Sequence, residues 1–221
     1  TLHGDHHLGV KQPFYWRLAP NLDALLTPAY DNERHGHITQ RWRYLGVNSA
    51  LTLAGDYWFH DPTYVAFKQK TLAESTNLST YQRNMLSRPS GARAWFFADG
   101  DALLFGQLHA NTHIRWIKDD YLVDDVHPPL DMPDGRHLAS DVSLEDQWSA
   151  IHARFWALRY HTLQPAWQTQ APNLYDRMPE WDMNWQGSSE WLAGLFGIHW
   201  QSVRFVHGEA TDALGDAASG W

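Results

Sequence analysis

Fourteen histidines are the residues of this sequence best suited to metal chemistry. The closest groups are His3, His6 and His7, and His35 with His37. His109 and His113 are predicted to share a strand face, but residues four apart in a strand are about 13 Å apart, too far to bind one ion. No HExxH or similar spacing is present. We therefore expect solvated histidines, or histidines lining a water-filled lumen, and no metal site.

Two pairs of aspartates form a second candidate ligand group, Asp119 with Asp120 and Asp124 with Asp125. Calcium binds several hard oxygen ligands, so a Ca²⁺ site is one interpretation of this loop. A solvated acidic loop is the interpretation we favour. No GxSxG elbow or glycine-rich phosphate loop occurs, and cysteine is absent. The sequence therefore predicts a protein that is not an enzyme and has no cofactor.

The segment Leu103–Ile117 has two chemically different faces if it forms a strand. One register is apolar and ends in Trp116; it holds Leu104, Gly106, Leu108, Ala110, Thr112, Ile114 and Trp116. The other is polar and basic and holds Gln107, His109, Asn111, His113 and Arg115. A transmembrane β-barrel needs this pattern repeatedly, with polar side chains toward the lumen. In a barrel this polar register would line the lumen, but a soluble sheet could also produce the pattern once.

Alternation of this kind recurs along the chain, and it predicts about ten strands. They are Leu8–Leu18, Leu22–Tyr30, His37–Leu45, Ser49–Phe59, Ala92–Asp99, Leu103–Ile117, Ser140–Trp148, His152–Gln164 with a bulge near Trp156, Glu180–Gln186 and Glu190–Val206. No segment shows a persuasive helical stripe. Short and longer connections alternate between the strands, as they do in outer-membrane barrels with short periplasmic turns and longer outer loops.

The composition sets further bounds on the class of protein. The net charge of −8 argues against nucleic-acid binding. No run of about 18 apolar residues exists, so no transmembrane helix is expected. Thirteen tryptophans and nine tyrosines fit a membrane interface or a sugar-binding surface. The chain starts without methionine and ends abruptly at Trp221, so we expect a fragment of a longer protein.

Two prolines lie inside early predicted strands, Pro13 and Pro28. Proline removes a donor from the hydrogen-bond ladder and is normally confined to edges and bulges. Two prolines in neighbouring strands therefore have two interpretations. They mark a plain sheet edge, or they weaken a seam between strands that has a function.

The segment Gln12–Gly46 resembles the start of the barrel in the LptD family of outer-membrane lipopolysaccharide-assembly proteins. The family pattern P-[FY]-Y-W-x-[LI]-A-P-N-x-D-A-x-x-T-P-x-Y is matched at Pro13, Tyr15, Trp16, Ala19, Pro20, Asn21, Asp23, Ala24, Thr27, Pro28 and Tyr30, and Arg43-Tyr44-Leu45 follow. Looser similarity continues in order to about residue 207, at Lys118–Asp124, Tyr175–Trp181 and Phe205–His207. Asp61-Pro62-Thr63-Tyr64 resembles the same loop motif as the segment at 119–124, so the two assignments compete.

The resemblance implies an all-β, antiparallel, up-and-down transmembrane barrel segment in the outer membrane of a Gram-negative bacterium. Residues 1–221 would be the N-terminal part of that barrel, with a preceding jellyroll domain and later strands lying outside the sequence. In isolation we expect an open curved sheet.

For function, the resemblance implies transport of lipopolysaccharide to the outer leaflet through a lateral opening between the first and last strands. The partners it implies are lipopolysaccharide, outer-membrane lipid, the plug lipoprotein LptE and a periplasmic bridge bound through the jellyroll. Pro13 and Pro28 match early-strand prolines thought to weaken the seam. The alternatives are a soluble, tryptophan-rich all-β carbohydrate-binding module and a diffusion porin.

Overall fold

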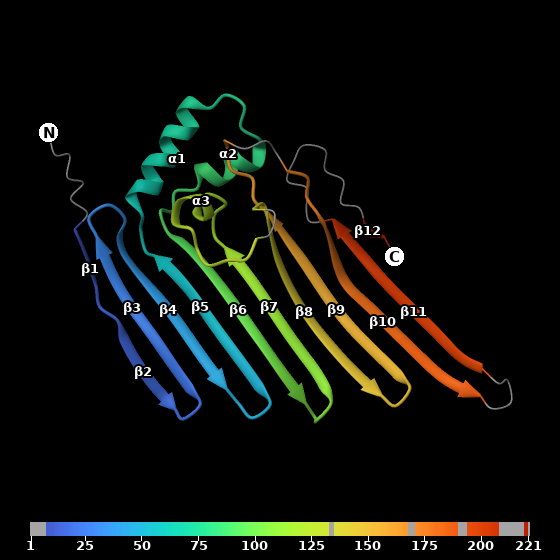
Figure 1. The fold of residues 1–221 in the computed structure, drawn as a ribbon. Coiled ribbons are helices and arrows are strands. Elements are labelled where there is room, and N and C mark those ends of the chain that lie inside the picture. Colours follow the sequence, from blue (N-terminus) through green and yellow to red (C-terminus); the bar gives the residue numbers. More distant parts are fainter. Residues whose placement is uncertain (1–7, 133–134, 168–170, 190–193, 208–218, 221) are drawn as a thin grey trace.

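A computed structural model describes residues 8–132, 135–167, 171–189, 194–207 and 219–220, which form one antiparallel sheet with a small helical layer (Figure 1). The strands are β1 (Gly9–Lys11), β2 (Phe14–Ala19), β3 (Leu22–Asp31), β4 (His35–Leu45), β5 (Ser49–Trp58), β6 (Arg93–Leu104), β7 (Leu108–Ile117), β8 (His137–Trp148), β9 (Ile151–Thr162), β10 (Tyr175–Ser189), β11 (Gly194–His207) and β12 (Ser219–Gly220). They pair in chain order, with β1 and β2 both on β3. Within the described residues the sheet does not close, which confirms the predicted open antiparallel sheet.

The predicted strand Leu103–Ile117 is wrong at its start. Leu103 and Leu104 end β6, and a tight turn at 105–107 leads into β7. The turn is closed by the Gln107 amide, which donates to the Leu104 carbonyl at 3.2 Å. Phe105 and Gly106 have φ values of 52° and 83°, the positive pair that a type I′ hairpin turn requires. Phenylalanine rarely adopts this conformation, so the sequence carried little signal for the turn.

Two further strand predictions are corrected by the pairing of the strands. The predicted strand Leu8–Leu18 is interrupted at 12–13, where β1 ends and β2 begins. The predicted bulge near Trp156 lies instead on the neighbouring strand β10, where the register shifts between Arg177 and Glu180. Strand β9 pairs with β8 without any shift.

Three helices were not predicted: α1 (Pro62–Glu74), α2 (Thr80–Ser87) and α3 (Leu122–Val126). The first two begin with ordinary side-chain caps, whereas α3 has none. Asp61 caps α1 by accepting from the Tyr64 amide at 3.0 Å, and Ser79 with Gln82 forms a capping box on α2. Only Tyr64 and Lys68 are buried along α1, so it has no clear apolar stripe for sequence periodicity to detect. Among the described residues, the helices are all too short or too polar to cross a membrane.

Short turns gather at one end of the sheet and the longer connections at the other (Figure 1). The long connections after β5, β7 and β9 carry the helices or pack near them, whereas β2–β3, β4–β5, β6–β7 and β8–β9 are joined by tight turns. The predicted alternation of short and longer connections therefore holds from β4 to β10, but the connection β3–β4, expected to be longer, is a three-residue turn like those at the opposite end. Residue 8 lies at the end with the long connections, because the Asn32 amide donates to its carbonyl at 3.2 Å.

The two faces of the sheet have opposite character, and neighbouring rows of paired residues show it. One row crosses six strands with apolar side chains: Ile114, Ala98, Leu53, Trp42, Ala24 and Trp16. The adjacent row faces the other side and is polar: His113, Asp99, Thr52, Arg43, Asp23 and Arg17. Exposed side chains of the apolar face include Phe14, Tyr57, Trp116, Trp148, Trp181, Met183, Ile198 and Trp200.

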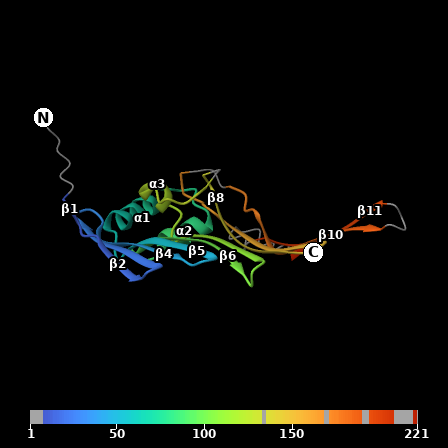
Figure 2. The ribbon, with the colours of Figure 1, turned by 60° about the horizontal axis from the view of Figure 1, so that its bottom comes forward.

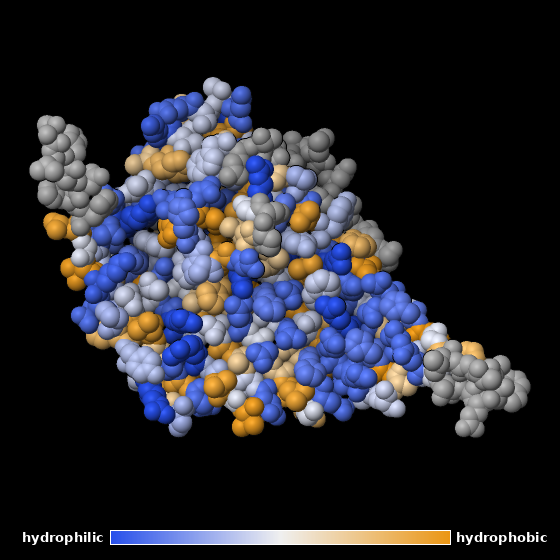
Figure 3. All heavy atoms as spheres, viewed as in Figure 1, coloured by the Kyte–Doolittle hydropathy of each residue, from blue (hydrophilic) through white to orange (hydrophobic). Residues whose placement is uncertain are grey.

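The helices cover the polar face at the end with the long connections. Figure 2 shows the sheet edge-on, with α1 and α3 on one side of it. Beneath them a core joins Trp58, Trp95 and Ile117 of the sheet to Leu122 of α3. A second core, made by Tyr64, Met85, Leu86 and Tyr121, holds the helices together. The rest of this face carries a broad hydrophilic area over β7 to β10 (Figure 3).

Candidate functional site

The predicted polar register of β7 lies on the polar face, with one exception. His109, Asn111, His113 and Arg115 all point to the side that carries Asp99 and the helices, as their cross-strand pairs require. Gln107 does not belong to this row, because it lies in the turn between β6 and β7.

Carboxylates on neighbouring strands pair with the basic side chains of this row. Arg115 makes an ion pair with Asp99 of β6, Nη1 to Oδ1, at 2.6 Å, and its guanidinium lies 5.3 Å from the centre of the Phe97 ring. Only 13% of the Arg115 side chain is exposed. His113 lies 3.5 Å from Asp141 of β8. Arg115 is thus compensated by the sheet itself, and both contacts join adjacent strands.

Two more histidine–carboxylate pairs continue this arrangement across the polar face. His152 of β9 contacts Glu145 of β8 at 2.8 Å, and His199 of β11 contacts Asp182 of β10 at 3.3 Å. All of these pairs join neighbouring strands. In the described part of the chain, however, no three of its histidines, aspartates and glutamates gather closely enough to hold a metal ion.

The two prolines lie at the same place in the sheet, on adjacent strands at its first edge. The register of β1 and β2 on β3 is continuous, so Gln12 lies opposite Pro28 and Pro13 opposite Thr27. Both prolines therefore fall at the break between β1 and β2. One bond crosses this break, from the Gln12 amide to the Pro28 carbonyl at 3.1 Å.

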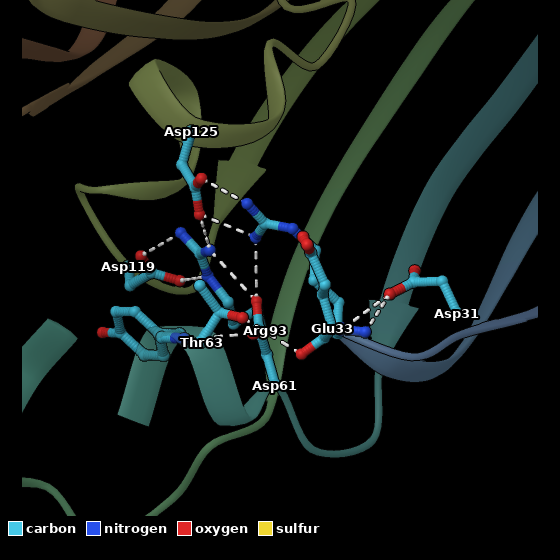
Figure 4. Close-up of polar contacts among 9 residues, drawn as sticks. Asp31, Glu33, Asp61, Thr63, Arg93, Asp119 and Asp125 are labelled. Carbon is cyan, nitrogen blue, oxygen red and sulfur yellow. Dashed lines mark hydrogen bonds and ion pairs between the residues drawn. The ribbon is translucent and has the colours of Figure 1, made fainter. Parts of the chain in front are cut away.

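A cluster of five charged side chains, which the sequence did not predict as a unit, joins the connections to the sheet (Figure 4). It consists of Arg34, Asp61, Arg93, Asp119 and Asp125. Arg93 begins β6, is completely buried, and donates to all three aspartates. Arg34, from the turn between β3 and β4, contacts Asp61 at 3.0 Å and Asp125 at 2.5 Å.

The expected solvated acidic loop is wrong for Asp119 and Asp120. Both are buried, with 4% and 1% exposure, and each has a basic partner: Arg93 for Asp119 and His161, at 2.8 Å, for Asp120. Asp124 is exposed, as expected. The loop therefore uses its carboxylates chiefly to anchor itself on the sheet.

Burial and ion pairing act in opposite directions on the two aspartates that bind Arg93. Burial raises the pKa of Asp119, and its ion pair with Arg93 only partly offsets this effect. Burial also acts to raise the pKa of Asp125, but hydrogen bonds from Arg34 and Arg93 outweigh it and hold that pKa below its usual range. Asp125 thus supplies a firmly ionised partner for both arginines.

The fold defines a class of protein: an open, up-and-down antiparallel sheet with one apolar and one polar face, whose helical connections are folded onto the polar face. No family model matches the chain. Curated proteins named LPS-assembly protein LptD do match it, which confirms the resemblance predicted from the sequence.

The LptD of Coxiella burnetii is 26% identical over 185 residues, covering 77% of this chain and 21% of the relative. The LptD of Legionella pneumophila is 25% identical over 177 residues, covering 80% of this chain and 20% of the relative. The LptD of Pasteurella multocida is 43% identical over a shorter stretch of 51 residues, 23% of this chain and 6% of the relative. The chain thus spans about a fifth of the length of the first two relatives.

Proposed function

We propose that this chain is part of an LptD-type outer-membrane β-barrel that assembles lipopolysaccharide into the outer leaflet of a Gram-negative bacterium. The observation that carries the proposal is the pair of opposite faces, together with similarity to LptD over most of the chain. An exposed apolar face spanning six strands is costly in water and suits contact with lipid tails. Its role is assembly and transport rather than catalysis.

In this proposal residues 1–221 form the first part of the barrel, and the polar face lines the lumen. His109, Asn111, His113 and Arg115 then lie along the route of the sugar part of lipopolysaccharide. The plug lipoprotein LptE would occupy the lumen, and a periplasmic bridge would deliver lipopolysaccharide through a preceding jellyroll domain. The ion pair of Arg115 with Asp99 and the contact of His113 with Asp141 support a mainly structural role for those two side chains.

The seam between the first and last strands is the proposed lateral exit for the lipid part. The edge formed by β1 and β2 supports this role, because Pro13 offers no amide donor on the outer side of this edge and Pro28 offers none to Gln12 on its inner side. Fewer hydrogen bonds between two strands lower the free energy needed to separate them. The later strands of the full-length protein would complete the barrel on the far side of β11.

The direction of the chain bears on which end of this sheet faces the periplasm. Residue 8 lies at the end with the helical connections, so a periplasmic domain preceding it places those connections on the periplasmic side. This orientation reverses the one expected from loop length alone. A cysteine introduced at Val47, fully exposed in a tight turn, should then react with an impermeant thiol reagent in intact cells. A cysteine at Lys70 on α1 should not.

Depletion of the full-length protein in its own host tests the proposed function directly. We expect newly made lipopolysaccharide to disappear from the cell surface while its synthesis continues. Normal surface delivery after depletion would contradict the proposal. A soluble carbohydrate-binding module would extract without detergent and leave surface lipopolysaccharide unchanged, and a porin would alter solute uptake instead.

A further inference from the structure

A cavity of about 320 Å³ lies between α1, α3 and the segment that follows β9. Four aromatic rings, Tyr64, Phe67, Tyr121 and Trp167, line it together with Thr63, Asp124 and Asp125. It lies on the helical layer, apart from the polar side chains of β7 and from Pro13 and Pro28. The proposed transport of lipopolysaccharide gives this cavity no function.

The aromatic rings form one continuous wall. The centre of Phe67 lies 5.0 Å from that of Tyr121 and 5.8 Å from that of Trp167, and Tyr121 and Trp167 are 5.2 Å apart. Tyr121 is buried, whereas 54% of Trp167 is exposed. An exposed tryptophan held against a packed aromatic cluster offers a ring surface to a ligand.

The charged side chains that line the cavity are both carboxylates. Its described lining contains two carboxylates and no lysine, arginine or histidine. Asp125 is held by Arg34 and Arg93 behind the wall, whereas Asp124 is exposed and forms no ion pair within the described residues. Carboxylates and the faces of aromatic rings both attract positive charge and repel anions.

The same aromatic cluster already stabilises two cations of the protein. The Arg93 guanidinium lies 4.3 Å from the centre of the Tyr64 ring, and the Lys68 ammonium lies 4.9 Å from it. Both contacts are within the range of a cation–π interaction. Phe67 and Trp167 have no such internal cation among the described residues; Phe67 stacks on Tyr64 and is partly buried, so Trp167 offers the more open ring surface to a ligand.

We propose that this cavity binds an organic cation, an ammonium or guanidinium group, over Trp167 and Phe67 with Asp124 as its counter-ion. The charge of Asp124, unpaired in the described chain, disfavours phosphate and carboxylate groups. The cation has two possible sources: a lysine or arginine side chain of a polypeptide, or an amino sugar.

Calorimetric titration of the full-length protein in detergent tests the site with four probes: the tripeptide Lys-Lys-Lys, glucosamine, N-acetylglucosamine and glucose 6-phosphate. We expect saturable binding of the cationic probes and none of the phosphate. Tighter binding of the tripeptide identifies a polypeptide source, and tighter binding of glucosamine identifies an amino sugar. Equal binding of glucosamine and N-acetylglucosamine, preferred binding of the phosphate, or no saturable binding would each overturn the proposal.

Matched variants assign any binding to this cavity. Asp124→Asn and Trp167→Ala should each weaken the cationic probe about two- to fivefold, the effect of one exposed cation–π or charge contact. Trp167→Phe should retain most of the affinity. Asp131→Asn makes the same charge change on an exposed residue of the same connection, outside the cavity lining, and should have no effect. Equal losses in Asp124→Asn and Asp131→Asn would show that net charge, and not this site, attracts the probe.

Discussion

Gln12 donates its backbone amide to the Pro28 carbonyl across the first two strands of the sheet, and Pro28 has no amide hydrogen to return. Pro13 follows directly and also has no donor, but adjacent residues of a strand point their amides to opposite sides, so its missing donor lies on the outer edge, away from β3. The rest of β3 pairs with β4 without interruption from Leu22 to Asp31. Separation at this edge should therefore begin between β1–β2 and β3, and not between β3 and β4.

Replacing both prolines in the full-length protein should strengthen this edge. In Pro13→Thr/Pro28→Val the donor restored at position 28 can bond the Gln12 carbonyl, and the donor restored at position 13 faces the outer edge, toward the strand that would close the barrel; each such backbone hydrogen bond is worth about 0.5–1.5 kcal/mol. We expect slower appearance of newly made lipopolysaccharide at the cell surface, measured by pulse labelling. Pro129→Thr, at an exposed proline after α3, should leave the rate unchanged. Unaltered delivery in the double variant would rule out a gating role for the seam.

Arg93 is the residue on which the helical layer should depend most strongly. Its removal in Arg93→Met leaves Asp119 buried without its arginine partner and leaves Asp61 with Arg34 alone. Breaking a buried ion pair in this way typically costs about 3–5 kcal/mol. We expect the connections around α1 and α3 to become sensitive to protease in the folded, membrane-inserted protein.

The matched control is Arg83→Met, which makes the same change at an exposed residue of α2. It should leave the protease pattern of the wild type intact. If Arg93→Met and Arg83→Met were equally resistant, the cluster would not anchor the helical layer.

Acid should loosen α3 through Asp125. Because its pKa is lower in the folded chain than in the unfolded one, Asp125 contributes stability above the unfolded value of about 3.9, and this contribution is lost as the pH falls through the folded pKa. Asp119 has a raised pKa and acts in the opposite sense, so its protonation offsets part of the loss. Hydrogen exchange of α3 should therefore accelerate below about pH 4.

Asp125→Asn should weaken α3 at neutral pH and flatten this acid dependence, because the titrating group is gone. Asp131→Asn should keep the wild-type profile. An acid dependence that is the same in Asp125→Asn and the wild type would assign it to other groups.

The sequence predicted most strands because each alternates over many residues, as the row from His109 to Arg115 does. It could not place Gln107, since the preceding turn depends on Phe105 adopting a positive φ that phenylalanine rarely takes. The cluster of charged side chains around Arg93 could not be predicted from the sequence either. Arg34, Arg93 and Asp125 are far apart along the chain and meet only once the connections fold back over the sheet, so no local pattern marks them.

The assignment of the two faces can be tested at neighbouring residues of β7. Ile114 lies on the exposed apolar face, and His113 lies beside it in sequence but on the polar face, next to Asp141. In a membrane-inserted sheet, arginine facing the lipid costs about 2–4 kcal/mol near the bilayer midplane, whereas a lumen-facing arginine is tolerated.

Ile114→Arg should therefore lower the amount of full-length protein assembled in the outer membrane, measured by heat-modifiable migration on gels. His113→Arg introduces the same side chain one position away and can keep an ion pair with Asp141, so its assembly should match the wild type. Equal assembly of the two variants would mean that the apolar face does not contact lipid. Loss in His113→Arg alone would reverse the assignment of the faces.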